Sequence, residues 1–154
     1  YGDEIGTLNN YDYLEDESKS NDSRWLQRPT TDWSKTELRN QPGTVEYRIF
    51  SNLKKMIALR KEVPAFADYN NRELVGVENP HLFVFLRFDP QNSRARIMVI
   101  ANFDDHPQSM NFATLHQMGF FQHKIIVDIY SGKSLSILDG RIVIPPMSFY
   151  WLSV

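Results

Sequence analysis

"LFVFLRFDPQNSRARIMVIANF", residues 82–103, contains two runs of β-branched, aromatic and other apolar residues. The runs cover residues 82–88 and 95–103, and a turn-forming Asp-Pro-Gln-Asn sequence at residues 89–92 separates them. Short runs of this composition, bounded by turn-forming residues, are typical of β-strands. The stretch therefore predicts two short strands with a turn between them.

The second half of the chain repeats this pattern. Further runs of the same kind lie at residues 72–78, 124–130, 141–144 and 148–154. Turn-forming pairs between the runs are Asn79–Pro80, Ser131–Gly132 and Asp139–Gly140. Short strands that are separated so regularly favour an antiparallel sandwich or a small barrel. We expect a mainly β fold with a C-terminal antiparallel β-sandwich.

Residues 44–61 have the apolar spacing of an amphipathic helix. Thr44 is placed to cap the helix N-terminus, since its hydroxyl can accept a hydrogen bond from the first turn. Arg60 and Lys61 suit the negative C-terminal end, and Pro64 prevents continuation. The residues of the apolar stripe are Val45, Ile49, Leu53 and Ile57.

Residues 7–41 are polar and follow neither a strand nor a helix period. We expect a long loop here, and loops of this length in compact domains are commonly binding loops or lids. Four aromatic residues argue against disorder, because disordered segments contain few of them. These residues are Tyr11, Tyr13, Trp25 and Trp33.

Residues 1–6, "YGDEIG", are interpreted as the end of a buried strand that turns into the loop. A strand, a loop and one helix cannot bury their own apolar faces, so this unit is expected to be the last part of a larger α/β layer. The predicted division is residues 1–63 for the strand end, loop and helix, and residues 64–154 for the β-sandwich.

The composition of the 154-residue chain excludes several classes of function. The formal net charge is −2, so there is no electrostatic reason to expect nucleic acid or an anionic membrane as a partner. The chain contains no cysteine, which excludes disulfides and thiolate metal sites. No apolar run approaches the roughly 18 residues of a membrane span.

Several stretches resemble the α-amylase superfamily, glycoside hydrolase family thirteen. "YGDEIG" resembles the segment at the last strand of its (β/α)8 barrel, and "MIALRKEVPAF" at 56–66 resembles the final barrel helix that leads into the C-terminal β-domain. The end "PPMSFYWLSV" at 145–154 fits that domain. Within the superfamily, "NDSRWLQRP" at 21–29, "ANFDDHPQSM" and "TLHQMGF" most resemble amylosucrases and the related sucrose hydrolases.

This resemblance implies a sucrose-acting parent enzyme with a retaining mechanism, in which an aspartate nucleophile and a glutamate acid/base flank the scissile bond. The glucosyl unit passes to an α-glucan in amylosucrases and to water in the hydrolases. These carboxylates belong to earlier barrel strands, so no catalytic residue is expected in this chain, and the chain alone is predicted to be inactive. A trehalose synthase of the same superfamily is a further alternative.

The resemblance also implies a role for Arg24. The matching arginine in amylosucrases pairs with an aspartate from an earlier loop and closes the floor of the glucosyl pocket, a role that suits the planar, permanently charged guanidinium. Without that partner, Arg24 is expected to lack a carboxylate. Trp25 is a candidate for stacking on a sugar ring, whereas Tyr11 and Tyr13 are expected to pack within the loop.

Other polar residues are expected to have structural or solvated roles. Asp3 and Glu4, as neighbours in a strand, would point to opposite faces and could not flank one bond. The acidic run Asp12, Glu15, Asp16, Glu17 and Asp22 lacks the spacing of a calcium loop. The histidines have neither metal-ligand spacing nor a neighbouring carboxylate pair, so neither a metal nor a cofactor is expected. They are His81, His106, His116 and His123.

The expected partners are sucrose and α-glucan for the intact enzyme, the N-terminal barrel of the same protein, and a second copy of the chain through exposed apolar surface. The resemblance and the lack of cysteine suggest a cytoplasmic location. An autonomous carbohydrate-binding or interaction module is the alternative from another class. Because the aromatic residues of 82–88 and 148–154 stand in apolar runs, we expect them to lie in a core and not on a binding face.

Overall fold

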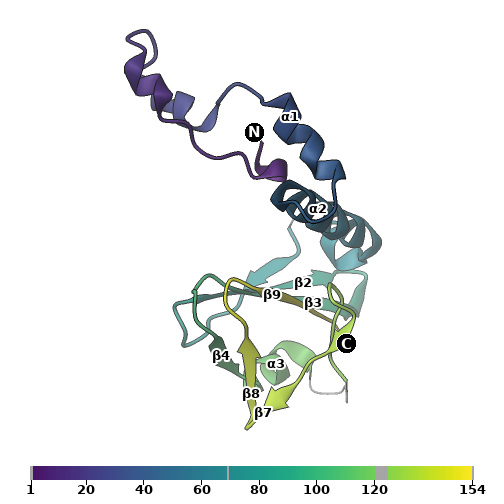
Figure 1. Ribbon diagram of the computed structural model, residues 1–154. Helices are drawn as coiled ribbons and strands as arrows, with labels where there is room; N and C mark the ends of the chain where they lie inside the picture. The colour runs from purple at the N-terminus through teal and green to yellow at the C-terminus, as the bar shows by residue number, and fades with distance from the viewer. Residues whose placement is uncertain (1, 69, 121–124, 154) are drawn as a thin grey trace. The chain divides into compact units, whose positions relative to one another are not determined.

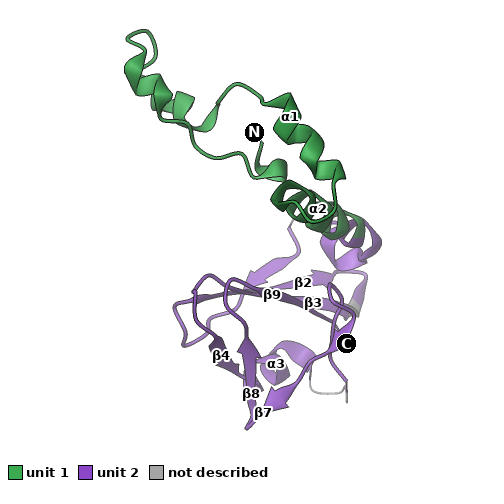
Figure 2. Cartoon of the chain, viewed as in Figure 1, with its two compact units in different colours: residues 1–58 green, residues 59–154 purple. Residues whose placement is uncertain are grey.

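The computed structural model describes residues 2–68, 70–120 and 125–153 (Figure 1). The chain divides into two compact units, Tyr1–Ala58 and Leu59–Val154 (Figure 2). No helix among the described residues has the length and apolarity that crossing a membrane requires.

The second unit consists of two antiparallel sheets. The larger sheet has the strand order β1-β2-β3-β9-β5-β6 and the smaller has the order β4-β8-β7 (Figure 1). The strands of the larger sheet are β1 Arg72–Leu74, β2 Leu82–Asp89, β3 Asn92–Asn102, β5 Val127–Asp128, β6 Lys133–Ser134 and β9 Phe149–Ser153. Those of the smaller sheet are β4 Gln108–Asn111, β7 Ile137–Leu138 and β8 Arg141–Ile144.

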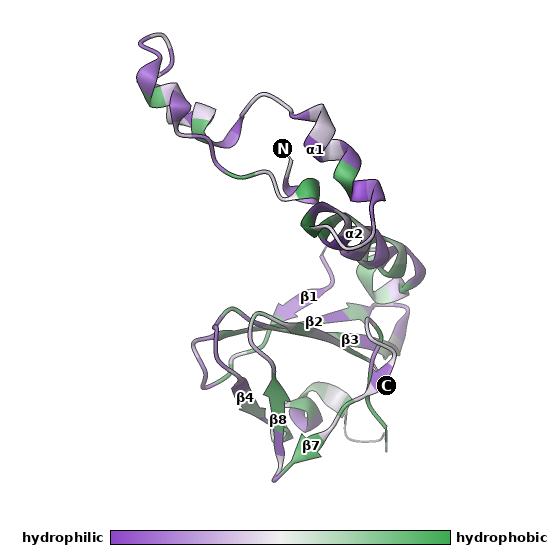
Figure 3. Cartoon of the chain, in the orientation of Figure 1, coloured by the Kyte–Doolittle hydropathy of each residue, from purple (hydrophilic) through white to green (hydrophobic). Residues whose placement is uncertain are grey.

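One hydrophobic core joins the two sheets. Most of strand β8 has the colour of hydrophobic residues in Figure 3. Ile142 and Ile144 of this strand are fully buried, whereas Val143 between them is 45% exposed. Leu115 of the short helix α3, Ala113–Leu115, and Phe120 of the following π-helical turn, His116–Phe120, fill the same core. The predicted antiparallel β-sandwich is confirmed, since each sheet buries one face against the other.

The shorter strands differ from the prediction. Only Arg72–Leu74 of the run at 72–78 and Val127–Asp128 of the run at 124–130 are strands. Strands β4, β6 and β7 were not predicted. Strands β6 and β7 have two residues each, too few to show a period of two, and β4 contains no β-branched or aromatic residue. Lys124 and Val154, at the ends of two predicted runs, lie outside the described residues.

The expectation that the aromatic residues of β2 and β9 lie in the core is wrong for Phe83, Phe85 and Phe149, whereas Trp151 on the same side is buried. Leu82, Val84 and Leu86 face the core, so Phe83 and Phe85 face the opposite side of the sheet. On that side Phe83 is paired through Ala101 with Phe149, and Phe85 through Val99 with Trp151. Phe83 is 47% exposed, whereas Trp151 is buried beside Phe66, with 5.0 Å between ring centroids.

An apolar run in a strand with two apolar faces cannot reveal which face is the core. We call the side opposite the core, with Phe83, Phe85, Phe149 and Trp151, the outer aromatic face. Phe88 and Tyr150, by contrast, pack partly against the core, as predicted.

The predicted helix is present as α2, Val45–Glu62, most of which belongs to the first unit. The Thr44 hydroxyl accepts a hydrogen bond from the backbone N–H of Tyr47 at 3.1 Å, as predicted for an N-cap. No residue of α2 is buried, and Val45, Leu53 and Ile57 of its apolar stripe are 55, 39 and 45% exposed. Three of the four residues of the apolar stripe are therefore exposed, and Ile49 is half-buried.

Residues 7–41 contain several short helical turns and are not a structureless loop. These are the 3₁₀ turns Asp12–Glu15, Ser23–Gln27 and Leu38–Asn40 and the helix α1, Trp33–Glu37. The N-cap residues of the turns at Asp12–Glu15 and Ser23–Gln27 and of α1 are Tyr11, Asp22 and Asp32. The side chains of Asp22 and Asp32 accept a backbone hydrogen bond, and that of Tyr11 does not.

The predicted strand end at residues 1–6 is not observed among the described residues. Asp3–Ile5 form a 3₁₀ turn between Gly2 and Gly6, which have φ angles of 94° and 64°. The left-handed conformations of Gly2 and Gly6 interrupt an extended chain on both sides of this turn. A strand also needs a neighbouring strand as a hydrogen-bond partner. Tyr1 lies outside the described residues.

Candidate functional site

Arg24 lies in the 3₁₀ turn Ser23–Gln27 and forms an ion pair with Asp22. Its Nε and Nη2 donate to the Asp22 carboxylate at 2.8 and 2.7 Å, and its backbone N–H donates to the same group at 3.1 Å. The side-chain hydrogen bonds from Arg24 lower the pKa of Asp22 from 3.8 to about 2. The Arg24 side chain is 72% exposed.

The expectation that Arg24 lacks a carboxylate partner in this chain is therefore wrong. Asp22 caps the turn that contains Arg24, so the same carboxylate both starts the turn and holds the guanidinium. Asp22 and Arg24 are only two residues apart, so this ion pair could have been predicted from the sequence. The resemblance implied a different partner, an aspartate of an earlier loop.

Trp25 is 40% exposed, and the Lys19 ammonium lies 5.4 Å from its ring centroid. Lys19 also forms an ion pair with Asp16 at 2.7 Å, and hydrogen bonding to Lys19 lowers the pKa of Asp16 to about 2. Two carboxylates of the acidic run, Asp16 and Asp22, thus pair with cations of the same loop. This arrangement favours the interpretation of the run as loop charge.

The first unit contains a cavity of about 430 Å³ between residues 2–10 and residues 29–39. Its lining includes the carboxylates of Glu4 and Asp32, the Arg39 guanidinium and Trp33, which is 74% exposed. Such a mixture of an aromatic ring with charged hydrogen-bonding groups is suited to a polyhydroxylated ligand.

Arg24 and Trp25 do not line this cavity. Trp33 was not predicted as a binding residue. It follows Asp32, which accepts the N–H of Lys35 at 3.1 Å, and aspartate is a common N-cap residue at the start of a helix. Asp3 and Glu4 are both exposed, and only Glu4 lines the cavity, so the two do not act together there.

A second cavity, of about 390 Å³, lies in the second unit beside Asp128 and Tyr150. Asp128 is buried, and its carboxylate accepts the N–H groups of Trp151 and Ser131 at 2.9 and 3.0 Å. Burial raises the pKa of Tyr150, whose hydroxyl donates to the Val143 carbonyl at 3.2 Å. Because their hydrogen bonds hold the backbone together, we assign these two residues structural roles.

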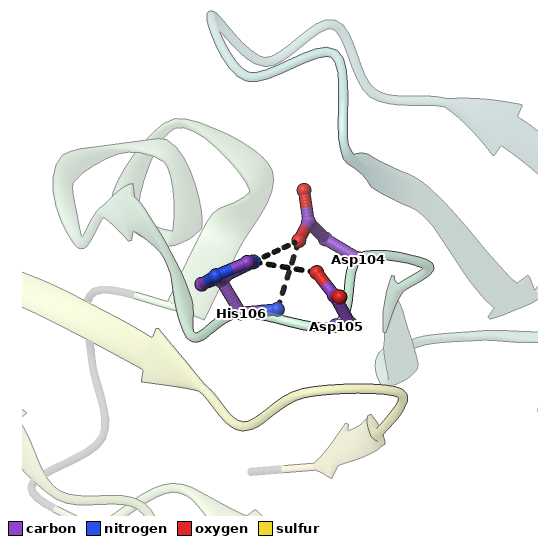
Figure 4. Close-up of side chains that lie close together, drawn as sticks. All are labelled: Asp104, Asp105 and His106. Atoms are coloured by element: carbon purple, nitrogen blue, oxygen red, sulfur yellow. Dashed lines mark hydrogen bonds and ion pairs between the residues drawn. The ribbon is translucent and has the colours of Figure 1, made fainter.

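A cluster of polar side chains lies at the end of β3 (Figure 4). His106 Nδ1 lies 2.5 Å from Asp105 Oδ1 and 3.2 Å from Asp104 Oδ1, and His81 Nδ1 lies 2.5 Å from Asp104 Oδ2. The expectation that no histidine has a neighbouring carboxylate pair is wrong at His106. The sequence Asp-Asp-His at 104–106 displayed this pair directly.

The other histidines give no such cluster among the residues that the structure describes. The exposed His116 ring contacts that of Phe112, with 5.1 Å between centroids. His123 lies outside the described residues.

No model of a known protein family matches the sequence. Among solved structures, AmyP in complex with maltose is similar to 73% of this chain, with a TM-score of 0.56 and 14% identity. The pullulanase from Bacillus acidopullulyticus is similar to 80% of the chain, with a TM-score of 0.52 and 20% identity. The chain spans 21% of the AmyP structure and 15% of the pullulanase.

These neighbours are members of the α-amylase superfamily, and they match part of the chain at low identity. Likeness at this level concerns the fold. The mainly β architecture of this chain is accordingly one that occurs within proteins of that superfamily.

Proposed function

We propose that this chain is the C-terminal part of a retaining, sucrose-acting enzyme of the α-amylase superfamily, similar to amylosucrases. The observation that carries the proposal is the shared fold with AmyP, which was crystallised with an α-glucan fragment, maltose. The sequence resemblance at residues 21–29 and 56–66 supports the narrower assignment to sucrose. The reacting carboxylates belong to the part of the enzyme that precedes this chain.

Arg24 is the residue of this chain that we assign to the glucosyl pocket. Its guanidinium is exposed and is oriented by Asp22, so it is available to a second carboxylate contributed by an earlier loop. A guanidinium can bind two carboxylates at once because it has five N–H donors. In this proposal Asp22 orients Arg24, and the second carboxylate closes the pocket floor.

The test is sucrose turnover by the intact enzyme, measured as fructose release. Arg24→Ala should lower kcat/KM for sucrose by about 100-fold, because displacement of a positioning group commonly has an effect of that size. Arg28→Ala is the matched control, since Arg28 is an exposed arginine of the same loop. Unchanged turnover in Arg24→Ala would remove the pocket assignment.

The same assay separates the transferase from the hydrolase. An amylosucrase releases fructose while the glucosyl units accumulate as α-glucan, whereas a sucrose hydrolase releases equal amounts of fructose and glucose. We propose the transferase, and the ratio of the two products decides between them, because "NDSRWLQRP" resembles amylosucrases and the related sucrose hydrolases alike.

A carbohydrate-binding or interaction module is the second candidate, and the outer aromatic face favours it. Phe83 is 47% exposed there, and its ring lies 5.5 Å from that of Phe85. Exposed aromatic rings on a sheet are suited to stacking on sugars. Soluble starch should retard this chain on a native gel, and Phe83→Ala should abolish the retardation. Leu138→Ala, an exposed apolar residue of the other sheet, is the control.

A further inference from the structure

The cluster at residues 104–106 combines two carboxylates with imidazole groups. One side-chain ligand atom from each of Asp104, Asp105 and His106 lies within 4.8 Å of the others. His81 adds a second imidazole from a separate loop, with its Nδ1 2.5 Å from Asp104 Oδ2. One nitrogen and two oxygen donors thus meet at one place (Figure 4), and the second imidazole lies against the other oxygen of Asp104.

The hydrogen bonds in this cluster leave excess negative charge. His106 Nδ1 faces both Asp104 Oδ1 and Asp105 Oδ1, yet one ring nitrogen carries at most one proton. The two carboxylates of the cluster have a formal charge of about −2. A divalent cation placed among Asp104, Asp105 and His106 would offset that charge.

The donor set and its spacing indicate which cation. Zinc binds imidazole nitrogen and carboxylate oxygen at about 2.0–2.2 Å in a tetrahedron, which places neighbouring ligand atoms about 3.3 Å apart. His106 Nδ1 and Asp104 Oδ1 are already 3.2 Å apart. The two contacts of 2.5 Å would open by less than about 1 Å, a shift that the exposed rings and the exposed Asp105 permit.

Asp104 is fixed in place before any ion binds. Its carboxylate accepts the His106 N–H at 2.8 Å, and its own N–H donates to the buried Asn102 at 2.9 Å. The Asn102 amide also donates to the His106 carbonyl at 2.9 Å, and Phe103 N–H donates to the His81 carbonyl at 3.2 Å. These bonds hold the two loops that contribute the imidazoles.

From this geometry we infer a binding site for zinc or a similar divalent transition metal, formed by His81, Asp104, Asp105 and His106. The inference is independent of the proposed function, since it rests on the second unit alone. A bound ion would join the loop before β2 to the loop after β3 and stabilise the sandwich at that end.

The test is titration of the 154-residue chain with zinc chloride near neutral pH, followed by calorimetry and by the NMR signals of the histidine rings. One zinc ion should bind per chain at micromolar concentration, and the ring signals of His81 and His106 should shift while that of His116 stays. Calcium and magnesium should bind much more weakly, because they prefer oxygen ligands.

His106→Gln should weaken zinc binding by about tenfold or more, since loss of even an outer partner of a ligand costs about 10- to 100-fold. The His106 ring is 78% exposed, so its removal leaves the fold intact, which circular dichroism checks. His116→Gln is the matched control and should bind zinc as the wild type does. Absence of binding at millimolar zinc, or equal affinity in His106→Gln, would overturn the inference, as would equal loss in His116→Gln.

Discussion

At the scale of single residues, the pair Asp22–Arg24 connects local structure with the proposed pocket. Arg24→Ala should raise the pKa of Asp22 from about 2 toward 3.8, because the side-chain hydrogen bonds from Arg24 are the largest cause of the low value. NMR titration of the Asp22 carboxyl carbon measures this shift.

Arg28→Ala is the control for that titration, since Arg28 acts on Asp22 only through the weakest of the causes and should change its pKa much less. Because the pKa of Asp22 is lower in the folded chain than in the unfolded chain, the ionised carboxylate stabilises the fold. This contribution is present above pH 3.8 and is lost as the pH falls through about 2. A pKa of about 2 in Arg24→Ala would show that the guanidinium does not hold the carboxylate.

Asn102 is the buried polar residue on which the loop around residue 104 depends. Its amide donates to the carbonyls of His106, Ile144 and Pro145 at 2.9, 3.2 and 2.9 Å. Asn102→Asp should lower the free energy of unfolding by about 2–4 kcal/mol, because a carboxylate cannot donate and would face three carbonyl oxygens. Urea denaturation measures the change.

Asn111→Asp is the matched control for Asn102→Asp. Asn111 is exposed, and its Oδ1 accepts the Ala113 N–H at 2.9 Å, a role that aspartate preserves. Its effect should stay within about 0.5 kcal/mol. Equal effects of the two substitutions would contradict the assigned role of Asn102.

Residues with local signals were easier to predict than residues whose partners are distant in the chain. Thr44 was predicted as a cap because a cap bonds within three residues. The approach of His81 to Asp104 depends on how two loops meet, which one-dimensional spacing does not express. The pair Asp105–His106 is visible in the sequence as adjacent residues, a closer spacing than that of common metal-ligand patterns.

At the scale of elements, strand β8 gives the clearest test of the sandwich. Ile142→Ala should lower the free energy of unfolding by about 3 kcal/mol, because it opens a cavity in the fully buried core. Val143→Ala, one residue along the strand and 45% exposed, should cost less than about 1 kcal/mol. Thermal or urea unfolding of both variants measures the difference. A larger loss of stability in Val143→Ala would contradict the account, because it would mean that Val143 and not Ile142 faces the core.

The longer elements were predicted well and the shorter ones poorly, for a physical reason. Helix α2 and strands β2 and β3 contain enough positions for a period to be read. The two-residue strands β6 and β7 form because neighbouring strands offer hydrogen-bond partners, not because of their own sequences.

At the scale of the whole molecule, the apolar stripe of α2 has a measurable consequence. Leu53 and Ile57 are exposed, and exposed apolar surface of this kind promotes association. We expect this chain to self-associate in sedimentation experiments, and Leu53→Ser combined with Ile57→Ser to reduce the association.

Leu138→Ser combined with Met147→Ser, which removes exposed apolar residues of the second unit, is the control and should have a smaller effect. A chain that remains monomeric at all concentrations would show that the stripe of α2 does not drive association.

The fold class was within reach of the sequence because it depends on the sum of many strand signals, and it survives errors in individual strands. Substrate choice has no such redundancy, since the proposed function rests on a few residues of one loop and on carboxylates that the proposal assigns to another part of the enzyme. The division between the predicted domains, residues 1–63 and 64–154, stays a prediction. In the structure, the boundary between the two compact units lies inside α2, after Ala58.

The most direct test of the central claim is the specificity of the intact enzyme, measured as kcat/KM for sucrose relative to maltotriose and pullulan. Our account predicts a ratio well above one for sucrose, with fructose as the released product. An enzyme that cleaves maltotriose or pullulan and leaves sucrose untouched would contradict the account, while retaining the fold that this chain shares with AmyP and the pullulanase.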